Sequence, residues 1–68
     1  MKFYMVAVED EHGCFFDGPE ALGAGNSALA REEGKRHWEH MTLHKGHRVV
    51  LYECREIAVV REGSEEEV

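Results

Sequence analysis

This chain has few of the residues that cross-link, anchor or export a protein. Its 68 residues include two cysteines, one proline and one tryptophan. Cys14 and Cys54 are too few to build a disulfide framework, so we expect reduced thiols packed as small apolar side chains. No apolar run is long enough to cross a membrane, and the first ten residues carry no small-residue cleavage site. We therefore expect a cytoplasmic protein with no membrane partner.

The charge is acidic overall and unevenly spread. The net charge is −6; residues 1–20 and 49–68 are acidic, whereas residues 21–48 hold five basic and three acidic side chains. This balance disfavours binding to a phosphate backbone, so we expect no direct nucleic-acid binding. A surface with two electrostatic faces steers charged protein partners. The alternative is that the charge only keeps the protein soluble and monomeric.

The first third of the chain predicts two antiparallel strands. Residues 2–9 alternate with apolar side chains on both faces, which is typical of a central strand. A polar turn follows, in which Gly13 suits a positive φ, and residues 14–17 form a short second strand. Asp17 and Glu20 then have the spacing of a capping box, which predicts a helical turn over residues 19–22.

The stretch 27–47 predicts the main helix. Gly23 and Gly25 separate it from the preceding turn, and Asn26 or Ser27 caps it; one kinked helix is the alternative. Gly46 is expected to end the helix. The residues expected on one face of this helix are Ala30, Gly34, His37, Trp38 and Met41.

Residues 48–61 are strongly β-prone. Their apolar pattern changes phase near residues 53–56, which fits one long strand with a bulge or two strands with a tight corner. We predict one α+β domain over residues 1–62 and an acidic, flexible tail over residues 63–68. Its fold is a two-layer ββαβ arrangement with an antiparallel sheet in the order 2-1-3 and one helix on one face. The other face of the sheet stays open and apolar, which favours a homodimer or a bound partner.

Four histidines make a metal site the alternative function. His37, His40 and His44 are spaced i, i+3, i+7 on the predicted helix, and His47 follows. Imidazoles at this spacing can hold zinc, nickel or copper. The competing interpretation is a buried His37 with the others exposed, and it is favoured because the spacing matches no zinc module. We therefore expect no metal and no cofactor.

No residue pattern predicts catalysis. In the alternating pattern of its strand, Cys54 falls on the same side as the core positions, where a thiol is structural. Adjacent carboxylates on turns and tails are normally solvated. A chain this small rarely encloses a substrate pocket, so we do not expect an enzyme.

Protein binding is the leading hypothesis for function. Trp and Arg are frequent interface anchors, and clustered carboxylates can occupy a nucleic-acid-binding groove of a partner. The candidate partner-binding residues are Glu9, Asp10, Glu11, Arg31, Lys35 and Trp38.

The pattern of a hairpin, one polar helix and a final Val-, Tyr- and Glu-rich strand resembles small proteins of bacteriophages and prophages. The final segment reads G-x-x-V-V-L-Y-E-C-x-E-I-A-V-V-R-E from Gly46 to Glu62. The resemblance is to ββαβ proteins of the anti-defence type, including anti-CRISPR inhibitors. It implies a binder that blocks a host protein or ribonucleoprotein complex by stoichiometric contact. It assigns no role to any single residue. A metal-binding module and a homodimeric structural protein remain the alternatives.

Overall fold

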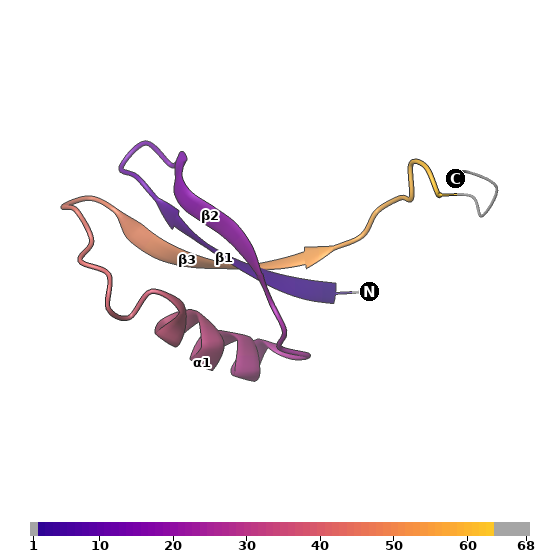
Figure 1. The fold of residues 1–68 in the computed structure, drawn as a ribbon, viewed down its shortest axis with the longest axis horizontal. Coiled ribbons are helices and arrows are strands. Elements are labelled where there is room, and N and C mark those ends of the chain that lie inside the picture. Colours follow the sequence, from indigo (N-terminus) through magenta and orange to yellow (C-terminus); the bar gives the residue numbers. More distant parts are fainter. Residues whose placement is uncertain (1, 64–68) are drawn as a thin grey trace.

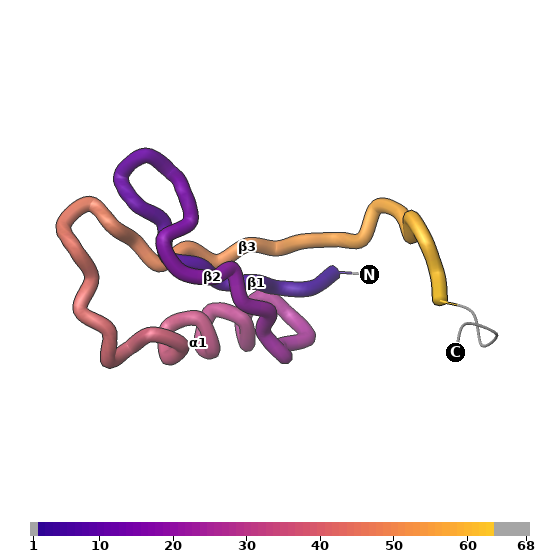
Figure 2. The backbone as a smooth tube through the Cα atoms, turned by 45° about the horizontal axis from the view of Figure 1, so that its top comes forward, coloured from indigo at the N-terminus to yellow at the C-terminus, as the bar shows by residue number. Residues whose placement is uncertain are grey.

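The chain folds as a three-stranded antiparallel sheet with one helix against one face. The computed structural model describes residues 2–63, in the order β1 (Lys2–Glu9), β2 (Phe15–Leu22), α1 (Ser27–His37) and β3 (Arg48–Arg55). The strand order is β2-β1-β3, so the predicted ββαβ fold and its 2-1-3 sheet are confirmed. Helix α1 lies along one side of the sheet, and residues 56–63 run away from it (Figures 1 and 2).

Strand β1 is central because its side chains are apolar on both faces. It pairs with β3 without interruption from Lys2 opposite Arg55 to Glu9 opposite Arg48. Val6 and Val8 are fully buried on the face that α1 covers, and Ala7 is fully buried on the other. The open face carries the alternate positions of the three strands, which include Phe3, Met5, Ala7, Phe15, Val50, Tyr52 and Cys54.

Strand β2 is longer than the sequence predicts. Asp17 pairs with Val8 and Glu20 with Val6, so Gly18 and Pro19 stand opposite the single residue Ala7 in a bulge. The predicted capping box and the helical turn over residues 19–22 are therefore wrong. An edge strand with a bulge tolerates a proline that has no N–H to donate, and Gly18 supplies the φ of +80° that the bend requires.

Helix α1 begins as predicted but ends ten residues early. Asn26 is the N-cap, and its side chain accepts a hydrogen bond from the Leu29 N–H at 2.9 Å. The helix ends at His37, so the prediction of helix to residue 47 is wrong. Tertiary contacts explain the early end: the Trp38 ring lies against Gly18, and the loop that follows packs His44 and His47 on Phe16. Gly46 does not end the helix but has a φ of +86° in the turn before β3.

The buried face of α1 is predicted only in part. Of the five residues expected on it, Ala30 and Gly34 are buried. Met41 lies beyond the end of the helix, and His37 is exposed, so the interpretation of a buried His37 is wrong. A methyl group on Gly34 would lie 3.9 Å from both Leu51 Cδ1 and Val6 Cγ2, so this face rests on the β1–β3 pair. Small side chains at positions 30 and 34 allow the helix to approach the sheet closely.

Strand β3 stops at Arg55, which pairs with the first residue of β1. The prediction of a bulged strand, or two strands, over residues 48–61 is therefore wrong. Residues 56–63 follow without helix or strand, and Ile57, Val59 and Val60 are 89%, 57% and 96% exposed. Of the predicted acidic tail, residues 64–68 lie outside the described part of the chain.

Candidate protein-binding groove

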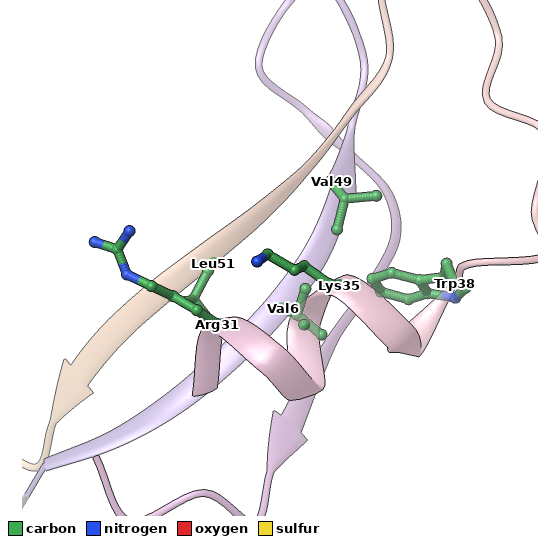
Figure 3. Close-up of a pocket in the computed structure, with 7 residues that line it drawn as sticks. Val6, Arg31, Lys35, Trp38, Val49 and Leu51 are labelled. Carbon is green, nitrogen blue, oxygen red and sulfur yellow. The ribbon is translucent and has the colours of Figure 1, made fainter. Parts of the chain in front are cut away.

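A groove runs between α1 and β3 (Figure 3). Its volume is about 320 Å³. It is lined by Val6, Arg31, Gly34, Lys35, Trp38, Val49 and Leu51. Three of the predicted partner-binding residues, Arg31, Lys35 and Trp38, are therefore brought together at one site.

The floor of the groove is apolar because of the sheet register. Leu51 pairs with Val6 and Val49 pairs with Val8, so both β3 side chains point to the face that carries α1. Gly34 has no side chain to fill the space above them. Val49 remains 39% exposed, which is high for a valine beside a helix. The groove thus exposes aliphatic surface that α1 does not cover.

Two cations flank this floor. Arg31 and Lys35 are four residues apart, so they lie one turn apart on the same flank of α1. Lys35 Nζ lies 3.4 Å from Glu32 Oε1 in an exposed ion pair, whereas Arg31 forms no ion pair with any residue that the structure describes. Ion pairs this exposed are weak, so both cations are available to a ligand.

Trp38 borders the groove at the C-terminal end of α1. Its ring lies against Gly18, where an added Cβ would be 3.2 Å from Trp38 Cη2. The His37 ring meets it edge to face, with ring centres 4.5 Å apart. His37 in turn contacts the Glu20 carboxylate on β2. The indole is therefore held by β2 and by its neighbour, and a partly buried aromatic side chain borders the apolar floor.

The three predicted acidic residues lie elsewhere, at the end of the β1–β2 hairpin. Glu9 is 4% exposed, and its Oε1 accepts a hydrogen bond from Arg48 Nη2 at 3.1 Å. Asp10 Oδ1 accepts the backbone N–H groups of His12 at 2.8 Å and Cys14 at 3.0 Å.

The hydrogen bond from Cys14, followed by that from His12, lowers the pKa of the Asp10 carboxyl below its ordinary value, because both stabilise the charged form. Glu11 lies over Gly46, where an added Cβ would be 2.8 Å from Glu11 Oε2. These carboxylates hold the turn and its neighbours, and none of them lines the groove.

The four histidines do not share a helix face, because α1 ends at the first of them. His37 contacts Glu20, and the exposed His40 lies 3.6 Å from Glu39. His44 meets the Phe16 ring edge to face, with ring centres 5.7 Å apart, and the tilted His47 ring lies 4.6 Å from it. Within residues 2–63, no three metal-binding side chains gather closely enough to hold an ion.

Sequence reasoning missed the groove floor and misplaced one thiol. Residues 49–52 are all apolar, so their pattern does not show which of them face the helix, and only the pairing of β3 with β1 places Val49 and Leu51 on that face. Cys14 is exposed, so the prediction that it packs as a small apolar side chain is wrong, whereas Cys54 is half-buried on the open face. On that face, a smaller hollow of about 230 Å³ is lined by Met5, Phe15, Pro19, Tyr52 and Cys54.

Comparison with known proteins adds no family. No family model, curated protein or solved structure matches this chain. Within residues 2–63, no helix is long and apolar enough to cross a membrane.

Proposed function

We propose that this protein is a non-enzymatic binding protein whose groove holds an acidic, aliphatic segment of a partner protein. The observation that carries the proposal is that Arg31, Lys35 and Trp38 line the same aliphatic floor, with Lys35 between the other two along α1 (Figure 3). A carboxylate of the ligand would pair with these cations while its aliphatic side chains cover Val49 and Leu51. Trp and Arg are the residues most often found at the energetic centre of protein interfaces.

The chemistry of the lining favours a peptide segment over the other ligand classes. Arg31 and Lys35 are the only titratable side chains among the described residues that line the groove. Two cations on a chain of net charge −6 give little attraction for a phosphate backbone. An apolar floor of this extent suits aliphatic side chains, which repeated phosphates do not offer.

A finer proposal rests on the resemblance of the sequence pattern to small phage proteins. In it, the bound segment belongs to a host protein or ribonucleoprotein complex in the cytoplasm, and stoichiometric contact blocks that complex. An inhibitor of this kind needs no reaction step, because occupying the surface is sufficient.

Selection from a random peptide library tests the groove directly. The purified protein is immobilised and used to select displayed linear peptides, which are then synthesised and titrated while the fluorescence of Trp38, the only tryptophan, is followed. We expect the selected peptides to combine Asp or Glu with Leu, Ile or Val. Their binding should change the Trp38 emission because the indole borders the groove.

A matched pair of variants locates the binding. Arg31→Gln removes a cation from the groove, and Arg36→Gln removes the same charge from an exposed position of the same helix outside the lining. We expect Arg31→Gln to weaken binding at least about fivefold, and Arg36→Gln less than about twofold. Selected peptides without an acidic bias, or equal losses in the two variants, would refute the proposal.

A further inference from the structure

The C-terminal run after β3 is an apolar, β-prone segment with no partner strand. Residues 56–60 continue the composition of β3, but Arg55 is the last residue of β3 that pairs with β1. Ile57 and Val60 are 89% and 96% exposed. β-Branched side chains in this number favour a sheet over solvent.

The outer edge of β3 is the sheet edge that this segment can join. In the order β2-β1-β3, both β2 and β3 are edge strands. The β2 edge is interrupted by the bulge at Gly18 and by Pro19, which has no N–H. The β3 edge is uninterrupted over eight residues. An edge of this kind is a template for another strand.

Residues 56–60 do not pair with β3 of their own chain, because the sequence between them has no residues that favour a tight turn. A hairpin between β3 and residues 56–60 needs Gly, Asn, Asp or Pro at its tip. None of these occurs between Arg48 and Glu62. A second copy of the chain provides the same edge without requiring a turn.

We propose that two copies pair antiparallel along β3, so that residues 56–60 of each copy extend the sheet edge of the other and complete its groove. The symmetric register that best matches side chains places Cys54 opposite Cys54. Glu53 then faces Arg55 of the second copy, Leu51 faces Ile57 and Val49 faces Val59. Opposite charges and apolar side chains therefore meet their complements across the two strands.

In neighbouring registers, the side chains that face one another across the two strands match less well. Centring the pairing on Arg55 sets the two Arg55 side chains opposite one another, and centring it on Glu56 does the same for two carboxylates. Like charges directly opposite destabilise a strand pair.

This pairing changes the groove because the second copy supplies one of its walls. Leu51 and Val49 form the groove floor, so the second copy's Ile57 and Val59 would lie beside them on the face that carries α1. The two helices do not collide: Leu51 is three residues from the axis, or about 10 Å, which separates the two grooves by about 20 Å along the strands. The pairing of the two copies does not depend on the proposed function. Only the statement that the second copy forms a wall of the ligand site rests on it.

The experiment combines mass measurement with cross-linking through the two cysteines. We expect light scattering to show a concentration-dependent mass that approaches twice 7.8 kDa. A short bis-maleimide should then link two copies of Cys14→Ser through Cys54. It should not link Cys54→Ser, although Cys14 is the more exposed thiol. A monomer at every concentration, or a dimer that links equally through Cys14, would overturn the proposal.

A second pair of variants tests which face of the segment is used. Val59→Glu places a carboxylate against the second copy's Val49 and should raise the dimer dissociation constant at least roughly 100-fold, since two valines are lost per dimer. Val60→Glu changes a more exposed residue that faces Arg48 in the proposed register, and should leave the dimer intact. Both sites are exposed in the single copy, so neither change should disturb folding. Equal effects of the two variants would refute the register.

Peptide titration separates this inference from the proposed function. The peptides selected above should bind Val59→Glu roughly tenfold more weakly than the dimer, because one groove wall is missing. If Val59→Glu binds them as well as the wild type, the groove functions without the second copy and the shared wall is refuted. If the dimer forms as described and no peptide binds, the proposed function fails while the pairing stands.

Discussion

Replacing Gly34 with alanine should stabilise the protein, although the position is buried beneath the sheet. An added Cβ would lie 3.9 Å from Leu51 Cδ1 and Val6 Cγ2, which is ordinary van der Waals contact. Alanine is favoured over glycine in a helix interior by about 1 kcal/mol, and the buried methyl group adds up to about 0.8 kcal/mol. We therefore expect Gly34→Ala to raise the free energy of unfolding by about 1.5 kcal/mol.

Urea and thermal unfolding of the two proteins would measure this change. For a domain of this size, about 1.5 kcal/mol corresponds to a rise in Tm of about 6 to 12 °C. The dependence of the unfolding free energy on urea should be unchanged, because the substitution does not alter the surface exposed on unfolding. Circular dichroism of the helix and the emission of Trp38 should report the same transition.

Gly46→Ala is the matched control, because its backbone conformation differs. Gly46 has a φ of +86°, and an added Cβ would lie 2.8 Å from Glu11 Oε2. The same substitution should therefore destabilise the protein by about 1 to 2 kcal/mol. If Gly34→Ala also lowered Tm, the helix would lie closer to the sheet than these distances allow, and the account of the groove floor would be wrong.

Substitutions at three further sites test the cap, the core and the turn, and a fourth, at an exposed site, is the control for the core. Asn26→Ala should lower the free energy of unfolding by about 1 kcal/mol in urea titrations, because the Leu29 N–H loses its acceptor. Val6→Ala should cost about 2 kcal/mol in the same assay since Val6 is fully buried, whereas Val60→Ala, at a 96% exposed site, should change stability by less than about 0.5 kcal/mol. Asp10→Asn should lower Tm at neutral pH. Because the folded state lowers the pKa of Asp10, the difference in Tm between variant and wild type should shrink as the pH falls below about 4. A difference in Tm that does not depend on pH would contradict the role assigned to the charged carboxyl.

The sequence was sufficient for the elements whose local signals agree with their tertiary setting. Strand β1 is apolar on both faces and became central, and Asn26 caps α1 as its residue type favours. Ala30 and Gly34 were predicted on one helix face and are its buried residues. In each case propensity and packing require the same conformation.

The errors occurred where a local signal was overridden by a distant contact. Asp17 and Glu20 match a capping box, but both positions pair with β1, and pairing along a buried strand outweighs one cap. Trp38 continues the helical pattern, yet its ring lies on Gly18, twenty residues earlier in the chain. No single-sequence pattern encodes such a contact. The same reason explains the candidate site: its cations and its tryptophan were predicted from residue type, whereas its floor depends on the β1–β3 register.

The central position of β1 has a consequence for how the chain folds as it is made. Its first partner, β2, is synthesised within the next fifteen residues, so the β1–β2 hairpin can form early. Its second partner, β3, places Arg55 opposite Lys2 and becomes available only when most of the chain has left the ribosome. Until then, Val6 and Val8 lack the strand that completes their burial, and the unpaired edge of β1 is open to other chains in the same state. Crowded synthesis on one messenger would therefore expose this protein to misassembly at an edge that the finished fold conceals.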